Sequence, residues 1–280
     1  MECGGEVSGG VEKNCKGVLT CVRIYDYIPA IGDPSVGGES GQREAAAMDT
    51  LPVEPRKLLA EFIGTFALIF AGAGSIVLFS SNAAGVIAIA LAHGLVIAVM
   101  VSSLGHISGG LFNPALTAGL WVTRRLDTMH AVAYVLAQIV GATVGAWALL
   151  LLFPEVLRES ANLGVPALGA DTTFAQGVAL EAVMTFFLML VVFGTALDGR
   201  GPKLGGIAIG LTITVDIFLG GPLTGAAMNP ARAFGPALAQ LSWDDHLVYW
   251  IGPVIGAVVA ALAYHYVFAA EEEGTSTAAA

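Results

Sequence analysis

Two copies of the tripeptide Asn-Pro-Ala, at residues 113–115 and 229–231, are the clearest chemical feature of this sequence. Asn is a preferred helix N-cap, and Pro is favoured at the first helical position, where its missing N–H costs no hydrogen bond. Each tripeptide therefore predicts a helix start. Such a start carries about half a positive charge at its N-terminus and an amide NH₂ group that can donate hydrogen bonds.

The two tripeptides belong to a longer internal repeat. Residues 60–66 (AEFIGTF) match 180–186 (LEAVMTF), 87–91 (IAIAL) match 207–211 (IAIGL), and 108–115 (SGGLFNPA) match 224–231 (TGAAMNPA). The order of the three matches is kept, and the spacing from the glutamate to the asparagine is nearly the same in both copies. A lone Asn-Pro-Ala is usually only a helix start, but two copies at equivalent repeat positions indicate a shared functional site.

The composition places this repeat in a membrane. Of the 280 residues 56% are apolar and only 12% are charged, with a net charge of −10. Most of the charges lie in residues 1–57 and in the tail at Glu271–Glu273. This excludes an ordinary water-soluble domain and a disordered chain, and an acidic chain without a basic run gives no reason to expect a nucleic-acid partner. The cysteines Cys3, Cys15 and Cys21 all precede the apolar region, which therefore has no disulfide framework or catalytic thiol.

Six apolar stretches are long enough to cross a hydrocarbon core of about 30 Å, which needs roughly 20 helical residues. They are Leu58–Phe79, Ala83–Gly105, Thr128–Phe153, Phe174–Leu197, Leu204–Leu223 and His246–Phe268. Two further apolar segments, Ile107–Val122 and Thr224–Leu241, are too short to span and are predicted to be re-entrant. Each of these short segments contains one Asn-Pro-Ala.

Three spans in each half give the two copies opposite topology. Inverted repeats with broken half-helices are typical of membrane channels and transporters, whose sites lie at the midplane. We therefore expect an all-α membrane protein with six transmembrane helices and two half-helices whose N-termini meet. Basic residues near the span ends predict both termini in the cytoplasm. Six basic residues lie on that side (Arg56, Lys57, Arg124, Arg125, Arg200 and Lys203), against Arg158 on the other.

The two loops, residues 105–115 (GHISGGLFNPA) and 225–232 (GAAMNPAR), resemble the signature loops of the aquaporin (major intrinsic protein) family. The opening at Ala60-Glu61-Phe62 is similar to the first helix of that family. The resemblance covers about residues 56–270, with repeats at about 56–153 and 174–268. It implies one pore per subunit, a homotetramer and no cofactor. A polar N-terminal segment (1–55, in which Met48 would be a natural family start) and an acidic cytoplasmic tail (271–280) lie outside it.

The resemblance also implies which residues act. The pore motifs are Asn113, Pro114, Ala115, Asn229, Pro230 and Ala231, and the spacing of the family places a selectivity filter at His93, Ile217, Ala226 and Arg232. This filter is similar to that of plant tonoplast intrinsic proteins, because strict water channels pair Phe and His with the arginine. Ala233 and Ala237 stand where glycerol channels usually carry an acidic and a basic residue.

Two intramembrane glutamates, Glu61 and Glu181, occupy equivalent repeat positions. A proton relay is one interpretation of such residues. The resemblance favours another, in which each carboxylate accepts hydrogen bonds from the backbone of a re-entrant loop. His106 is expected to help order the first loop, and Asp216 is expected to face protein rather than the pore.

The sequence thus predicts a passive channel for water that excludes protons and ions, in contact with membrane lipid. Ammonia, urea and hydrogen peroxide stay open as further solutes. The alternatives are a glycerol or small-solute facilitator, a coupled transporter, and a non-conducting structural protein on the same fold. No nucleophile triad, metal-ligand cluster or phosphate loop appears in the sequence, so an enzyme is not expected. A plasma membrane, as in bacteria, is the expected location, and a vacuolar membrane stays open.

Overall fold

The computed structural model describes residues 53–82 and 84–269, and within these ranges the chain is helical, without strands. The predictions for residues 1–52, including Met48, and for the tail 271–280 lie outside the described residues. The helices are α2 (Pro55–Ala67), α3 (Gly74–Phe79), α4 (Gly85–Ser108), α5 (Pro114–Val122), α6 (Thr128–Leu152), α7 (Glu155–Ser160), α8 (Phe174–Val192), α9 (Gly205–Thr224), α10 (Pro230–Gln240) and α11 (Val248–Ala263). Short helical turns join or extend them: η1 (Leu68–Ala73), η2 (Asn162–Gly164), η3 (Phe193–Leu197) and η4 (Tyr264–Phe268).

Six helices in the described chain are long and apolar enough to cross a membrane, which confirms the predicted spans to within three residues at their ends. They are Pro55–Phe79, Gly85–Ser108, Thr128–Leu152, Phe174–Leu197, Gly205–Thr224 and Val248–Phe268. Their outward faces carry large exposed apolar side chains, which suits a surface that contacts lipid or further subunits. The chain is thus a multi-pass integral membrane protein.

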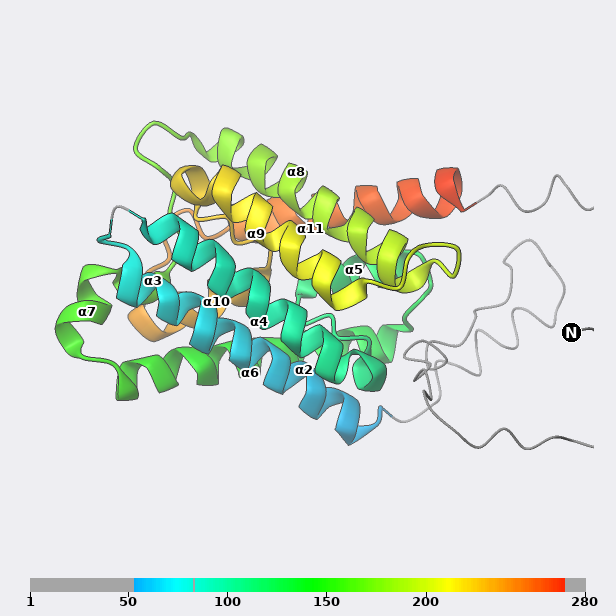
Figure 1. Cartoon of the computed structure of the whole chain (residues 1–280), viewed down its shortest axis with the longest axis horizontal. Coiled ribbons are helices and arrows are strands. Elements are labelled where there is room, and N and C mark those ends of the chain that lie inside the picture. The colour runs from blue at the N-terminus through cyan, green and yellow to red at the C-terminus, as the bar shows by residue number, and fades with distance from the viewer. Residues whose placement is uncertain (1–52, 83, 270–280) are drawn as a thin grey trace, which may run out of the picture.

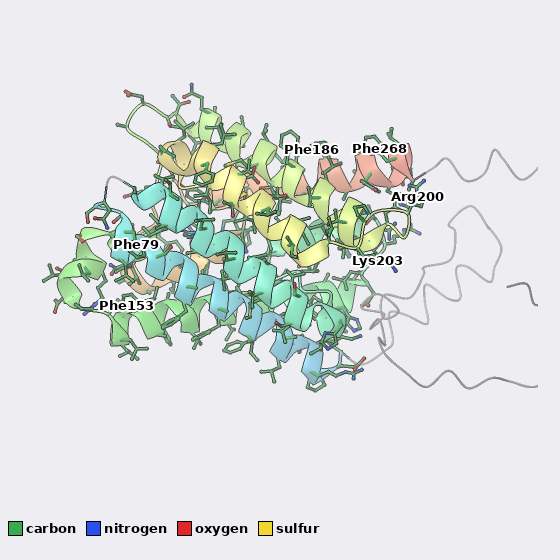
Figure 2. All side chains as sticks on the ribbon, in the orientation of Figure 1. Phe79, Phe153, Phe186, Arg200, Lys203 and Phe268 are labelled. Atoms are coloured by element: carbon green, nitrogen blue, oxygen red, sulfur yellow. The ribbon has the colours of Figure 1, made fainter. Side chains whose placement is uncertain are left out.

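The spans pack as an elongated bundle with two distinct ends (Figure 1). α8 packs against α11, α4 against α9, and α2 against α6. Glycines allow the closest approaches: at Gly210 an added Cβ would lie 2.2 Å from the carbonyl oxygen of Gly94. Arg200, Lys203 and Phe268 lie at the end where α2 begins, here called the termini end, whereas Phe79 and Phe153 lie at the opposite end (Figure 2).

The two short apolar segments form the half-helices α5 and α10 inside the bundle, with α5 packed on α11 and α10 packed on α6. Each begins at its proline, as predicted, with Asn113 or Asn229 as the N-cap. α4 and α9, the preceding spans, both end at a glycine in the left-handed conformation, Gly109 (φ 94°) and Gly225 (φ 79°). Glycine adopts this conformation without steric cost, so the chain can turn back into the bundle there.

Three spans contain a wider, π-helical turn: η1 in the first, η3 in the fourth and η4 in the last. Such turns are rare and are frequently found at functional sites. Apolar periodicity alone did not predict them, because one extra residue per turn leaves the segment equally apolar. η1 matters most for the site, since it lies in the first span against α4.

Candidate functional site: a pore between two half-helices

The two asparagines tie the re-entrant loops to each other. Nδ2 of Asn113 donates to the carbonyl oxygen of Met228 at 2.8 Å, and Nδ2 of Asn229 donates to that of Phe112 at 2.9 Å. The side-chain oxygen of each asparagine caps its own helix by accepting a backbone N–H, from Ala115 in the first copy. Because an amide NH₂ carries two hydrogens, each asparagine keeps one N–H for a molecule in the pore.

Glu61 holds the first loop from inside the bundle. Its Oε1 accepts from Ser108 Oγ at 2.6 Å and from the N–H of Leu111 at 3.1 Å. Its Oε2 accepts from the N–H of Phe112 and from Nε2 of Gln138, both at 2.7 Å. The carboxylate is fully buried and acts only as an acceptor, so its contacts are those of a structural brace for the loop.

Glu181 holds the second loop in the same way. Its Oε1 accepts from Thr224 Oγ1 at 2.7 Å and from the N–H of Ala227 at 2.9 Å. Its Oε2 accepts from the N–H of Met228 at 2.6 Å. The residue before each capping asparagine is in the left-handed region, with φ of 48° at Phe112 and 51° at Met228. Non-glycine residues rarely adopt this conformation, so the hydrogen bonds to the carboxylates offset local strain.

Sequence reasoning missed three polar side chains that complete the loops. Tyr134 donates its hydroxyl to the carbonyl oxygen of Ser108 at 3.0 Å, and Tyr249 donates to that of Thr224 at 2.9 Å. The third is Gln138, whose bond to the first glutamate is given above. The tyrosines follow their asparagines by 21 and 20 residues, so extending the repeat alignment into the third and sixth spans would have found them. His106 is exposed beside the first loop, and the loop's hydrogen bonds come from the groups above instead.

The structure brings the four filter residues to one cavity. Nδ1 of His93 lies 2.9 Å from the carbonyl oxygen of Ile89. A carbonyl only accepts, so Nδ1 carries the proton of the neutral ring and Nε2 remains an acceptor. Arg232 is 2% exposed, and its Nε and Nη2 have no hydrogen-bond partner among the described residues. The filter thus offers one acceptor, Nε2 of His93, and two donor nitrogens, Nε and Nη2 of Arg232. The apolar side chains of Ile217 and Ala226 complete its wall.

The connection between α7 and α8 holds the filter arginine in place. Nη1 of Arg232 donates to the carbonyl oxygen of Gly164 at 2.9 Å. Asn162, Leu163 and Gly164 all have positive φ (44°, 49° and 72°), and Leu163 is fully buried among apolar residues of the first and third spans. This buried leucine anchors the turn so that the carbonyl of Gly164 faces the guanidinium of Arg232. Apart from the glycine, no sequence pattern marked this turn.

A cavity of about 340 Å³ connects these groups. Its lining includes both capping asparagines, all four filter residues, and faces of α4 and α9 that run to the termini end: His93, Ile97, Val101, Gly105, Gly205, Ile209, Ile213 and Ile217. His93 and Ile217 are the last residues of α4 and α9 that line it toward the opposite end. The cavity is therefore a mostly apolar tube that ends at the filter, with polar groups at only a few levels.

The mouth of this tube lies at the termini end and is lined by Lys57, Arg125, Asp127, His130 and Lys203. The guanidinium of Arg125 lies over the ring of Phe193, with 5.1 Å from Cζ to the ring centroid. Burial lowers the pKa of Arg125 from its ordinary value, while nearby Asp198 opposes that shift. An arginine still keeps its charge at neutral pH. The mouth thus has charged groups of both signs.

Asp216 lies outside the cavity lining, as expected. It is 4% exposed, its Oδ2 has no hydrogen-bond partner among the described residues, and its neighbour in sequence, Ile217, faces the tube. The next turn of α9 carries Gly220, where an added Cβ would meet Met184 of α8. This places Asp216 on the side of α9 toward α8, and the contacts give it no role in the pore.

A methyl group at Gly64 is expected to displace the first loop. An added Cβ would lie 2.1–2.4 Å from three ring carbons of Phe112, which is fully buried. Overpacking of a core typically costs about 1–3 kcal/mol. Gly64→Ala should therefore lower the apparent melting temperature in detergent by about 3 °C or more. Gly105→Ala is the matched control, because its Cβ would meet only Val101 at 3.6 Å. Equal melting temperatures for the two variants would contradict this placement of Phe112.

These features define a polytopic membrane channel built from an inverted repeat, with two half-helices that meet beside a mostly apolar tube. The chain belongs to the family described as Major intrinsic protein, whose sequence model matches residues 49–264. This confirms the resemblance seen in the two loops.

Individual relatives agree with this membership. The chain is 45% identical over 227 residues to "Aquaporin TIP4-4" of Zea mays, covering 77% of this chain and 88% of that protein. It is 41% identical over 248 residues to "Aquaporin TIP1-2" of Musa acuminata, covering 85% and 94%, and 40% identical over 214 residues to "Aquaporin-2" of Bos taurus, covering 76% and 78%. The family and these names point to a channel and not to an enzyme, and the TIP names agree with the likeness to tonoplast intrinsic proteins.

A solved structure shares the fold. The X-ray structure of the aquaglyceroporin from Plasmodium falciparum matches with a TM-score of 0.69 and 24% identity, over 76% of this chain and 96% of that one. At this identity the match supports the helical architecture of six spans and two half-helices, and the solute has to be argued from the filter of this chain.

Proposed function

We propose that this protein is a passive channel for water that excludes protons and ions. The observation that carries the proposal is the tube itself: an apolar cavity that passes two capping asparagines and ends at a filter containing a buried arginine. Water crosses such a tube in single file, because the apolar walls offer few competing hydrogen bonds. The sparse polar groups replace part of its hydration at the narrow points.

Proton exclusion follows from the two half-helices. Their N-termini each carry about half a positive charge, which opposes a cation or a hydronium ion at that level. One N–H of each asparagine is held by the other loop, and the second is free to donate to a water. A water oxygen that accepts from both Asn113 and Asn229 has its lone pairs occupied, so it cannot readily relay a proton along the file.

The filter supports a solute range wider than water alone. His93 offers an acceptor at Nε2, and Arg232 offers donors at Nε and Nη2. Ile217 and Ala226 make the remaining wall apolar and, at Ala226, small. Ammonia, urea and hydrogen peroxide are small neutral molecules that can use both kinds of hydrogen bond, so they are the further solutes we assign to this filter.

The same proposal sets orientation and assembly. The excess of Lys and Arg at the termini end supports an orientation with both termini in the cytoplasm and the filter facing the other compartment. Membership of the family supports a homotetramer with one pore per subunit, in which lipid and neighbouring subunits cover the exposed apolar faces. The relatives named TIP support a vacuolar-type membrane in place of the plasma membrane expected from the sequence, and we assign residues 1–55 and 271–280 as cytoplasmic ends.

Stopped-flow light scattering of proteoliposomes tests the function. After a sucrose step, vesicles with the purified protein should shrink at least about tenfold faster than empty vesicles, a difference of about 1.4 kcal/mol in the barrier. The rate should depend weakly on temperature, and a pH-sensitive dye inside the vesicles should report no added proton leak. Gradients of urea, ammonia and hydrogen peroxide then measure the solute range, with glycerol as the larger comparison.

Shrinkage no faster than that of empty vesicles, from protein shown to be folded and tetrameric, would overturn the channel and favour a structural role for the fold. Glycerol flux as fast as urea flux would favour the small-solute facilitator. Saturation of urea flux at millimolar concentration would favour a coupled transporter instead, because a continuous pore does not saturate at such levels.

A further inference from the structure

The π-helical turn η1 brings a glycine against the filter histidine. A Cβ added at Gly72 would lie 2.6 Å from Cδ2 and 2.7 Å from Nε2 of His93. Real Cβ atoms essentially never approach a heavy atom this closely, so the imidazole occupies the space that any other residue at position 72 would fill. The ring is 3% exposed, and its Nδ1 is bound to the carbonyl oxygen of Ile89.

The first span cannot move away from this contact, because it is held on its other sides. From α6, an added Cβ at Gly145 would already lie 3.0 Å from Ile69 of the same turn. From the filter-supporting turn, an added Cβ at Gly164 would lie 3.0 Å from the carbonyl oxygen of Ala73. The turn is therefore packed against α4, α6 and the filter-supporting turn, and the cavity lining includes His93 but not Gly72.

We infer that Gly72, placed by the π-helical turn, sets the aperture of the selectivity filter by letting the His93 imidazole lie back against the first span. This inference rests on the proposed function, since it assigns His93 to the narrowest part of a conducting pore. Gly72 is a positioning residue: it acts on the solute through the ring and makes no contact of its own that selects one. A side chain at 72 would push the ring into the tube, toward Ile217 and Arg232, and narrow it.

The narrowing should separate solutes by size. Water needs the smallest aperture, whereas urea is wider and must fit between the ring and the opposite wall. Gly72→Ala is therefore expected to lower the ratio of urea to water permeability by at least about threefold. His93→Ala is expected to raise the same ratio, because it removes the ring from the wall.

The double variant distinguishes a positioning role from a general packing defect. If Gly72 acts through the ring, adding Gly72→Ala to His93→Ala should leave the urea to water ratio of His93→Ala unchanged. Gly74→Ala is the matched control, two residues further along, where an added Cβ would meet the end of the flexible Leu149 side chain at 3.1 Å. That control should keep the wild-type ratio.

Stopped-flow measurements on the five proteins give distinct outcomes. A wild-type protein that conducts neither water nor urea would defeat the proposed function itself. A conducting wild type with an unchanged ratio in Gly72→Ala, or with an additive effect in the double variant, would overturn the inference about Gly72 alone. If Gly72→Ala does not fold, recovery of folded protein in the double variant supports the contact with His93, and failure of both contradicts it.

Discussion

Replacing Arg232 by valine is expected to open this channel to cations. The guanidinium is buried at the filter end of the tube, with Nε and Nη2 directed to no protein acceptor among the described residues. At about 4 Å and an effective dielectric constant of about 20, a unit charge repels a cation by about 4 kcal/mol. The half-helix N-termini still oppose cations at Asn113 and Asn229, so only part of this barrier disappears. We expect at least about a tenfold rise in proton or sodium leak, equivalent to about 1.4 kcal/mol, with water flux retained.

Two further variants separate charge from geometry in this prediction. Arg232→Lys keeps the charge but loses the planar fork that reaches the carbonyl of Gly164, so ion exclusion should hold while the urea to water ratio changes. Arg125→Ala removes a positive charge from the mouth, at the opposite end of the tube from the filter, and should leave ion exclusion intact. Vesicles loaded with a pH-sensitive dye provide the measurement. A proton leak in Arg125→Ala equal to that in Arg232→Val would show that total charge, and not the filter, excludes ions.

The internal repeat made most of this fold predictable. Each half of the sequence carries a glutamate and an asparagine at equivalent positions and three spans. Because three is an odd number, the two halves must have opposite topology. The capping residues of α5 and α10 were predictable because Asn and Pro act locally, through the backbone N–H groups of one helical turn. The span ends were predictable because the bilayer fixes the length of an apolar helix.

What the sequence did not predict depends on contacts between distant segments. Leu163 is an ordinary leucine in a polar connection, and only the packed structure shows that it anchors the carbonyl that holds Arg232. Gln138 lies in an apolar span and finds Glu61 across 77 residues of sequence. The π-helical turn η1 leaves no mark in the apolar pattern, because its position is decided by packing against α4 and α6.

Replacing Glu61 by glutamine is expected to collapse the first half of the pore. Four donors point at the two carboxylate oxygens, and two of them are backbone N–H groups of Leu111 and Phe112. A glutamine amide has one oxygen and one NH₂ group, so in either orientation one backbone N–H faces another donor. A buried donor left without an acceptor costs about 1–3 kcal/mol, and charge-assisted bonds are lost in addition. We expect a clear drop in folded yield and, in the protein that folds, water flux reduced by about tenfold or more.

The same variant decides between a brace and a proton relay. If Glu61 were a relay, glutamine would abolish a proton current while leaving fold and water flux intact. If Glu61 is a brace, Glu61→Gln should lower both the folded yield and the water flux. Glu181→Gln should act in the same direction with a smaller effect, since three donors rather than four point at that carboxylate. Position 253, where the repeat would place a partner equivalent to Gln138, is a proline, which explains the missing donor. Glu155→Gln, on the exposed helix α7, is the matched control and should change neither yield nor flux. A larger loss of folded protein in Glu181→Gln than in Glu61→Gln would contradict this order.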